Sequence, residues 1–294
     1  MVWVGIATIV PPPGLMLGTA ELLFLVAPLV VVPLARAQVP SGEGVAGRVL
    51  DAATLLQPLA ALLLLIGCFF PNGHLAGGLA IPWLALTVAV AGAGALRLAT
   101  VKSLQHACFA VGQIYLAVGG AWAFASRWGM KPLGFEEPWV ILTANHFHYA
   151  GYATAMIVGL ALPRAVNRGA QVARASAVII LAGPPIVAAG ITGIPVVEVL
   201  SAVTLASGLF AFALMVLVHL VPRTRPRGAA ALLAVSAASL LVTMGFATTY
   251  AVTHFMGKTL LAIPTMVQVH GLLNVVGFCV AGLLGLYRSR PAKA

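Results

Sequence analysis

The sequence predicts an all-α, polytopic transmembrane helical bundle, and three observations support this prediction. Hydrophobic residues make up 61% of the 294 residues and charged residues only 7%, whereas roughly a quarter of an ordinary soluble domain is charged. The mean hydropathy is +1.06. Apolar runs of about 20 residues, the length that crosses a bilayer as a helix, recur along the chain. So few charged side chains could not cover the surface of a soluble fold of this size.

The apolar runs predict about nine spanning helices. They lie at about 15–36, 53–71, 77–98, 106–126, 138–162, 173–194, 196–221, 228–251 and 263–287. Only residues 192–195 (Thr-Gly-Ile-Pro) separate the sixth run from the seventh, and Gly and Pro can also kink one continuous helix. A tight helical hairpin is the preferred interpretation, because the combined stretch is too long for one span. The connections are short, so residues 1–294 are expected to form one integral membrane domain.

The first apolar run needs a test as a signal peptide, because residues 35–37 (Ala-Arg-Ala) resemble a cleavage site. A signal peptide begins with a basic region and has an apolar core of about 7–15 residues. This run has no basic region before it, is longer than such a core, and contains Glu21, Pro28 and Pro33. We therefore expect the first run to be a retained span.

The basic residues predict the orientation of the nine spans. With nine spans, three basic residues fall on one side of the membrane: Arg127, Lys131 and Lys258. The other 13 fall on the opposite side: Arg36, Arg48, Arg97, Lys102, Arg164, Arg168, Arg174, Arg223, Arg225, Arg227, Arg288, Arg290 and Lys293. Basic residues concentrate on the cytoplasmic side of membrane proteins. We expect a multi-pass protein of the cell membrane with its N-terminus outside and its C-terminus in the cytoplasm.

Two features of the composition carry little functional information. The net charge of +10 follows from this topology, and no basic patch lies on a soluble face, which excludes a nucleic-acid partner. Cys68, Cys108 and Cys279 are isolated within apolar segments. They form neither a metal-binding pair nor a disulfide framework, and we expect them to be buried as small hydrophobic residues.

Four ionisable residues from three distant spans lie at a similar predicted depth. At about 1.5 Å per residue, Glu21 lies roughly 9 Å from the outer surface, and His146 and His148 roughly 12–15 Å. His270 falls in a segment, residues 268–274, that lies roughly 8–17 Å deep. Ionisable side chains are costly inside a bilayer and usually functional there. The coincidence of depth predicts a site in the outer half of the membrane.

The spacing within each span indicates which side chains share a face. His146 and His148 lie about 200° apart around a helix, so only one of them can face a given point. A stripe with spacing i, i+3, i+4 and i+7 comprises Asn145, His148, Tyr149 and Tyr152. In the ninth span, His270 and Asn274 share a face because they are four residues apart. One arrangement places His148 and His270 in a common cavity with Glu21, while His146 turns toward a neighbouring helix.

Imidazole groups near neutral pH can transfer protons or bind metals. We predict His148 and His270 as the acid and base, with His146 nearby and Glu21 as orienting carboxylate or second base. Tyr149 and Asn274 would be hydrogen-bond partners of the reacting group. The predicted substrate-binding residues are Asn145, Tyr152, Gln268 and Glu137. Glu137 precedes Pro138 and also fits an ordinary helix start.

Three stretches of this sequence resemble one known family, the YndJ-like integral membrane proteins. Residues 142–152 (LTANHFHYAGY) resemble its signature LTAxHFHxAGF, with Asn145 where a small or apolar residue is expected and Tyr152 in place of Phe. Residues 270–278 (HGLLNVVGF) are similar to its HGxxNxxGF motif, and the first span is similar to its N-terminal helix around Glu21, Pro28 and Pro33. The resemblance spans nearly the whole chain. It implies an integral membrane protein and draws attention to the histidine motifs without implying a reaction.

Several functions remain open. The leading hypothesis is an integral-membrane enzyme that performs acid–base chemistry on a lipophilic small molecule: cyclisation, isomerisation, or hydrolysis of an epoxide or ketal. This enzyme would need no cofactor. A metal-dependent variant would bind Zn²⁺ or Fe through His146, His148, His270 and Glu21. A proton-coupled transporter would use the same residues as a relay, although no inverted repeat is visible. In a purely structural subunit, these residues would only join helices. Membrane lipid is an expected partner in each case.

Overall fold

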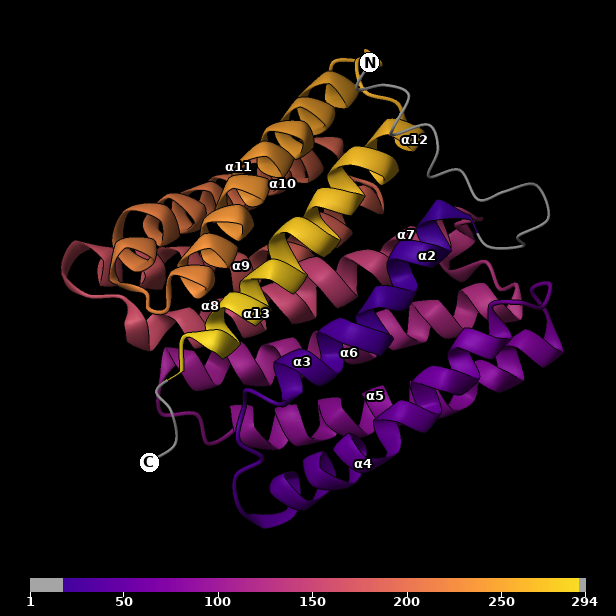
Figure 1. The fold of residues 1–294 in the computed structure, drawn as a ribbon. Coiled ribbons are helices and arrows are strands. Elements are labelled where there is room, and N and C mark those ends of the chain that lie inside the picture. The colour runs from indigo at the N-terminus through magenta and orange to yellow at the C-terminus, as the bar shows by residue number, and fades with distance from the viewer. Residues whose placement is uncertain (1–17, 291–294) are drawn as a thin grey trace. The chain divides into compact units, whose positions relative to one another are not determined.

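The computed structural model describes residues 18–290, and nearly all of them are helical (Figure 1). No strand occurs within this described range. The first half contains α2 (Thr19–Val26), η1 (Ala27–Val31), α3 (Val32–Arg36), α4 (Gly44–Gly67), α5 (His74–Leu98), α6 (Leu104–Trp128), η2 (Pro132–Gly134), α7 (Trp139–His146) and η3 (Phe147–Ala153). The second half contains α8 (Thr154–Ala161), η4 (Leu162–Arg164), α9 (Asn167–Ile191), α10 (Pro195–Met215), η5 (Val216–Leu220), η6 (Val221–Arg223), α11 (Arg227–Phe255), α12 (Ile263–Thr265), η7 (Met266–Gly271), η8 (Leu273–Val280) and α13 (Ala281–Arg288).

The described helices match the expected spans closely, which confirms the helical polytopic class. Within residues 18–290, eight helices are long and apolar enough to cross a membrane: Thr19–Arg36, Gly44–Gly67, His74–Leu98, Leu104–Trp128, Asn167–Ile191, Pro195–Arg223, Arg227–Phe255 and Ile263–Arg288. The fifth expected span corresponds to the elements from α7 to η4 and is not among these eight. Its N-terminal half carries the polar residues of the first histidine motif. The sixth and seventh spans are two separate helices joined by a turn, as the preferred interpretation predicted.

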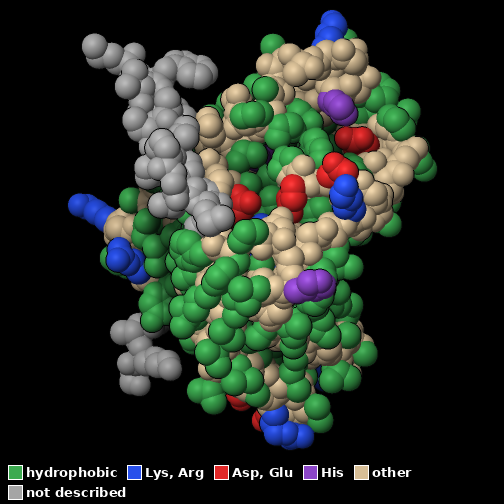
Figure 2. Space-filling model, turned by 90° about the vertical axis from the view of Figure 1, so that its right-hand side faces the viewer, with side chains coloured by type: hydrophobic (Ala, Val, Ile, Leu, Met, Phe, Trp, Pro, Cys, Tyr) green, Lys and Arg blue, Asp and Glu red, His purple; other side chains and the backbone are tan. Residues whose placement is uncertain are grey.

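The chain divides into two compact units. Unit 1 comprises Met1–Val101 and Phe109–Ala153, and unit 2 comprises Lys102–Cys108 and Thr154–Ala294. Each unit is described separately below. On the face drawn in Figure 2, hydrophobic side chains cover most of the surface and charged side chains gather in a few places. A predominantly apolar surface is what a helical bundle in lipid requires.

Unit 1 is built on the antiparallel pair α4 and α5 and on the first helix, which packs against α4 and α7. Small residues allow the backbones to approach: a Cβ atom on Gly67 would lie 3.0 Å from the Ala76 carbonyl oxygen. In α6, a Cβ atom on Gly119 would lie 2.5 Å from the His148 ring, and one on Gly120 would meet Thr87. Close packing of this kind replaces the hydrophobic driving force that is missing between helices in lipid.

Unit 2 is built on the hairpin of α9 and α10, with α11 packed on α10 and the last helical stretch packed on α11. The hairpin is tight because Gly183 contacts Leu205 and Gly208 contacts Ile179. A Cβ atom on Gly285 of α13 would lie 2.9 Å from the Leu233 side chain of α11. Glycine at these positions keeps the helices in contact along their length.

Candidate functional site

All three motifs that resemble the family contain π-helical turns. The first motif contains η1, the histidine motif of residues 142–152 contains most of η3, and the C-terminal motif overlaps η7 and η8. A further π-helical segment, η5, includes His219. Such wide turns are uncommon and are frequent at functional sites, because they shift backbone carbonyls out of the regular hydrogen-bond ladder.

The wide turn in the first helix leaves two carbonyl oxygens without their usual partners. The Ala27 amide donates to Phe24 and not to Leu23, and the Val32 amide donates to Ala27 and not to Pro28. Proline at 28 also removes one backbone donor. Carbonyl groups released in this way must find other donors, because lipid offers none.

Side chains from two other helices donate hydrogen bonds to these two carbonyl oxygens. The Tyr149 hydroxyl of η3 donates to the Leu23 carbonyl. The Gln57 side-chain amide of α4 donates to the Pro28 carbonyl. Both side chains are buried. Tyr149 therefore uses its hydroxyl proton to hold the first helix, which is a structural use of a residue that the sequence suggested as a hydrogen-bond donor to substrate.

The other members of the predicted stripe face the same helix. The Asn145 side-chain amide donates to the Ala20 carbonyl at 3.1 Å and to the Ile141 carbonyl at 3.0 Å. The buried Tyr152 hydroxyl lies 3.5 Å from the Val32 carbonyl. The stripe thus attaches the histidine motif to the first helix between Ala20 and Val32. Asn145, where the family signature leads us to expect a small or apolar residue, adds one of these attachments.

His148 lies at the centre of unit 1 and is completely buried. Its Nδ1 lies 2.8 Å from the Ala144 carbonyl oxygen, which can only accept, so Nδ1 carries the proton. Its Nε2 accepts from the indole Nε1 of Trp83 at 3.2 Å. Trp83 stacks on the imidazole and Phe24 meets it edge-on, with ring centroids 5.9 and 5.1 Å away. Both ring nitrogens are therefore bonded within the protein, and this geometry favours a neutral, structural imidazole.

The neighbouring predicted residues have separate surroundings. His146 is exposed and its Nδ1 lies 2.7 Å from the Leu142 carbonyl of its own helix. Glu137 accepts a hydrogen bond from the Ile141 amide at 3.2 Å, which supports its interpretation as a helix start. The bonding and ring partners of His148 are instead Ala144, Trp83 and Phe24.

Glu21 pairs with a residue that the sequence analysis assigned only to topology. Its carboxylate lies 3.7 Å from the Arg127 guanidinium at the end of α6. The Arg127 side chain is 5% exposed and the Glu21 side chain 23%. Arg127 also donates to Ser126 at 3.2 Å, while its Nε is buried with no partner among the described residues. The pair is loose, since 3.7 Å exceeds a direct hydrogen bond.

A second polar cluster lies within unit 2 and contains His270. The His270 Nδ1 lies 3.0 Å from the backbone carbonyl of Thr243 in α11, so Nδ1 is the donor and Nε2 carries the lone pair of the neutral ring. The buried Thr243 hydroxyl lies 3.1 Å from the Asn274 side-chain oxygen. His270 and Asn274 thus share a face toward α11, as their spacing predicts. Both are partly exposed, as is Gln268 of η7.

Two further observations bear on the chemistry. Among residues 18–290, no group of three or more His, Cys, Asp or Glu side chains is placed to hold a metal ion, so the metal-dependent alternative gains no ligand set. An apolar cavity in unit 2, near Phe212 and Phe278, has a volume of about 10 Å³. That is the size of one water molecule, and it cannot hold a lipophilic substrate.

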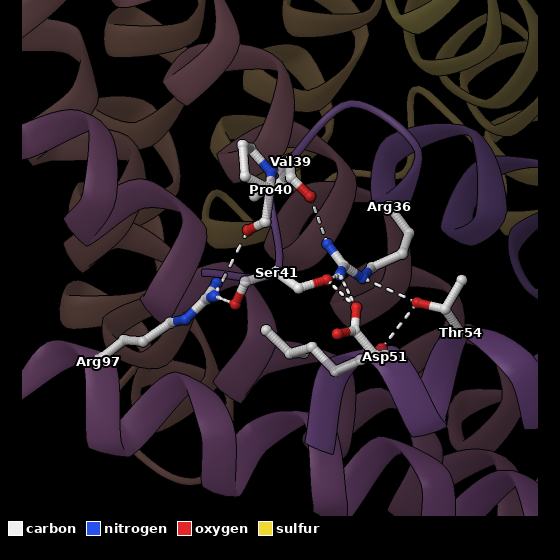
Figure 3. Close-up of polar contacts among 8 residues, drawn as sticks. Arg36, Val39, Pro40, Ser41, Asp51, Thr54 and Arg97 are labelled. Atoms are coloured by element: carbon white, nitrogen blue, oxygen red, sulfur yellow. Dashed lines mark hydrogen bonds and ion pairs between the residues drawn. The ribbon is translucent and has the colours of Figure 1, made fainter. Parts of the chain in front are cut away.

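A third polar cluster, in unit 1, fixes the connection between α3 and α4 (Figure 3). Arg36 donates to Thr54 at 3.0 Å and also to Val39 and Ser41. Its guanidinium lies 3.9 Å from Asp51, which accepts from Ser41. Arg97 of α5 donates to the Ser41 carbonyl. These basic residues are matched by acceptors within the chain, which indicates a structural role.

The sequence identified candidate site residues but not most of the residues that bond to them. Arg127, Trp83 and Thr243 each bond to a predicted site residue, and none of them was expected at the site. Of these three, only Arg127 gave a signal: it is the one charged residue between 107 and 128, and its charge complements Glu21. Gln57 was expected either to line a path or to bond across helices, and it bonds to the Pro28 carbonyl of the first helix.

The fold and the buried polar clusters define a helical integral membrane protein with several spans. Within that class, the chain belongs to the YndJ-like protein family, whose model matches residues 22–278. The match includes all of η1, η3 and η7 and most of η8, so it covers the wide turns described above.

One curated relative is the uncharacterized membrane protein YndJ of Bacillus subtilis (strain 168). It is 29% identical over 219 residues, which are 74% of this chain and 39% of that protein. The chain therefore spans about two fifths of the length of this relative. No solved structure matches the chain.

Proposed function

We propose that this chain is a multi-pass protein of the cell membrane that performs acid–base chemistry on a lipophilic small molecule. One observation carries the proposal: the Thr243 carbonyl orients His270 through Nδ1, while the ring stays partly exposed. A base held by a third group in this way is the usual arrangement of a proton-transfer residue.

In this proposal, Nε2 of His270 takes a proton from the substrate and returns it at another position. The sum of these steps is an isomerisation or cyclisation in which atoms are conserved; attack by water would instead give hydrolysis. Asn274 lies one turn further along the same face and is held by Thr243, so its side chain is positioned to bind a polar group of the substrate. His148 has a supporting role, because its two nitrogens bond to Ala144 and Trp83.

The test is conversion of a lipid by the purified full chain. Total lipid extract from the expression host is incubated with wild type, His270→Gln or His254→Gln, and the products are compared by mass spectrometry. His254 is the matched control because it is exposed and stacks on Tyr250 of its own helix. We expect a product with wild type and His254→Gln and a loss of at least about 100-fold with His270→Gln. Equal product formation by all three proteins contradicts the proposal.

A second function, proton-coupled transport, is favoured by the Glu21–Arg127 pair. Ionisable pairs inside membrane proteins often mark proton or substrate paths, and this carboxylate is partly exposed beside a buried guanidinium. Transport predicts proton flux into proteoliposomes under a pH gradient, measured with an enclosed pH-sensitive dye. Glu21→Gln should abolish the flux, and Glu43→Gln, at an exposed site, should leave it unchanged. Absence of flux with folded wild type contradicts transport.

A further inference from the structure

The last helical stretch of unit 2 carries an amide side chain close to the middle of its span. At about 1.5 Å per residue, Asn274 lies roughly 17 Å from one end of the helix Ile263–Arg288 and roughly 21 Å from the other. Water and phosphate headgroups supply no hydrogen bonds at this level of a bilayer. Each polar atom of Asn274 must therefore find its partner within the protein or on a lipid-soluble molecule.

The oxygen of this amide is bound by α11, which lies beside η8 (Figure 1). The Thr243 hydroxyl lies 3.1 Å from Oδ1 of Asn274 and 3.1 Å from the Leu240 carbonyl oxygen, and a hydroxyl group has one proton to donate. The Leu240 carbonyl already accepts from its own helix, because it lies in the interior of α11. Oδ1 has no other donor in the described part of the chain. We therefore assign the hydroxyl proton to Oδ1.

This assignment leaves the amide nitrogen, Nδ2, as the group that can bind a ligand. Nδ2 has no hydrogen-bond partner within residues 18–290, and Asn274 is partly exposed. In the same range, the buried side-chain atoms without a partner belong to other residues: Gln38, Gln113, Arg127 and Arg164. The nitrogen of Asn274 is therefore reachable from outside the protein, and it offers donors at a depth where an unmatched donor is unfavourable.

Asn145 in unit 1 shows how an asparagine that joins two helices uses the same nitrogen. Its Nδ2 donates to the Ala20 carbonyl at 3.1 Å and to the Ile141 carbonyl at 3.0 Å, so both amide protons are used within the protein. Asn274 is attached to α11 through its oxygen instead. Contact between helices therefore accounts for the oxygen of Asn274 and leaves its nitrogen unexplained.

A partner for this nitrogen must accept a hydrogen bond and also dissolve in the hydrocarbon core. A carbonyl oxygen on an apolar body meets both conditions, because it accepts hydrogen bonds and donates none. The ester carbonyls of phospholipids lie near the headgroups, at the edges of a core about 30 Å thick, and do not reach the middle of the span. The expected ligand is therefore a separate lipid-soluble molecule that carries a carbonyl group within its hydrocarbon part.

We propose that Nδ2 of Asn274 binds the carbonyl oxygen of a lipid-soluble ketone, and that Thr243 positions the amide for this contact. The inference rests on the proposed function for the role of this cluster as the substrate site, and it names the chemical class of the substrate. Thr243 acts through its neighbours: its hydroxyl holds Oδ1 of Asn274, and its backbone carbonyl accepts from His270 at 3.0 Å. A hydrogen bond to a ketone oxygen stabilises negative charge that develops there. Protons on the adjacent carbons then become easier to remove, as acid–base chemistry at His270 requires.

The test uses laurone, a symmetric dialkyl ketone whose carbonyl lies in the middle of its chain. The full chain is placed in nanodiscs of an ether-linked phosphatidylcholine, which has no ester carbonyl, and infrared difference spectra are recorded with and without the ketone. A hydrogen bond lowers the stretching frequency of a carbonyl group. We expect wild type to give a second ketone band at lower frequency that protein-free nanodiscs do not give. Asn274→Leu should reduce this band by at least about tenfold.

Three variants of α11 test the positioning role of Thr243. Thr243→Val removes the hydroxyl with little change in shape and should also reduce the band, whereas Thr243→Ser keeps the hydroxyl and should retain it. Thr253→Val is the matched control on the same helix, because the Thr253 hydroxyl bonds within its own helix, to the Thr249 carbonyl at 2.7 Å and the Tyr250 carbonyl at 3.3 Å. It should retain the band. Thermal unfolding checks that each variant is folded, and Thr243→Val replaces Asn274→Leu if the latter does not fold.

The carbonyl site is overturned if wild type gives no band at lower frequency, or if folded Asn274→Leu retains that band. Retention of the band by folded Thr243→Val overturns the positioning role of Thr243. The spectra report binding and not turnover, so they separate this inference from the proposed function. A band without conversion of host lipid contradicts the acid–base function and supports the carbonyl site, whereas conversion without a band contradicts the carbonyl site alone.

Discussion

His148 of unit 1 and His270 of unit 2 occupy the same kind of local structure with different results. Each lies in a π-helical turn of a family motif, and each directs Nδ1 to a backbone carbonyl. His148 is fully buried and its Nε2 is occupied by Trp83, whereas His270 remains partly exposed. Burial and the bond from Trp83 give His148 a structural role, whereas partial exposure of the His270 ring is what the proposed proton transfer requires.

The largest difference between the two histidines is expected when each imidazole is removed. His148→Ala leaves a cavity beside Trp83 and Phe24 and removes the acceptor of the Trp83 indole N–H, so we expect a loss of about 3–5 kcal/mol in the free energy of unfolding. His270→Ala should cost about 1 kcal/mol, because its ring is partly exposed and its hydrogen bond to the Thr243 carbonyl is lost. Thermal unfolding in detergent measures both. Similar losses for the two variants would remove the distinction between a structural and a functional histidine.

Adding one methyl group tests how tightly unit 1 is packed around His148. Gly119→Ala places a Cβ atom 2.5 Å from the His148 ring, and we expect it to destabilise the protein by about 1–3 kcal/mol. Gly245→Ala in α11 is the control, because nothing lies within 4 Å of its added atom. It should be neutral or stabilise by up to about 1 kcal/mol. A neutral Gly119→Ala would mean that His148 is mobile, contrary to its two hydrogen bonds.

Deleting single hydroxyl groups compares how much the stability of each unit depends on one side-chain bond to a backbone carbonyl. Tyr149→Phe leaves the Leu23 carbonyl without its donor and should cost about 1–3 kcal/mol. Ser236→Ala in unit 2 removes a 2.8 Å bond to the Phe278 carbonyl and should cost about 1 kcal/mol. The unfolding midpoints of both variants in the same detergent give the difference. If Tyr149→Phe is the milder change, the wide turn in the first helix does not depend on that bond.

The smallest effect is expected at the exposed edge of unit 1. A hydrogen bond and the charge from Lys131, 2.6 Å away, lower the pKa of Glu136 below its usual 4.5. The pair therefore stabilises the folded state at pH values above 4.5, and this contribution is lost as the pH falls through the lowered pKa. Glu136→Gln should remove a slight pH dependence of the melting temperature in that window and leave the value at pH 7 almost unchanged.

Most of the fold follows from hydrophobicity alone. Run length placed the described spans within a few residues, as at 228–251 against Arg227–Phe255, because lipid requires long uninterrupted apolar helices. The largest boundary error is at α4, which begins at Gly44 and not near 53. Its first turns carry Arg48 and Asp51, and the ion pair of Asp51 with Arg36 allows the helix to continue beyond the apolar run.

The candidate site could be predicted less well than the fold. Sequence periodicity indicates which side chains share a helix face, but it does not identify the groups to which they bond. The stripe from Asn145 to Tyr152 does share a face, but only the structure shows that it bonds to carbonyls of the first helix. One of these carbonyls, that of Leu23, is released by the wide turn. Arg127 was counted as a topological charge, although it is buried beside Glu21. Whether Glu21, His148 and His270 serve one cavity stays a prediction.

The wide turn at Ala27–Val31 also sets the direction in which the later side chains of the first helix point. One extra residue in a turn advances the later side chains by about 100° relative to a regular helix. Arg36 reaches Thr54 and Asp51 only in this phase. Deleting one residue between 27 and 31 would therefore turn Arg36 away from its acceptors. A relative with a one-residue gap at this position should also differ at the residues that correspond to 36, 51 and 54.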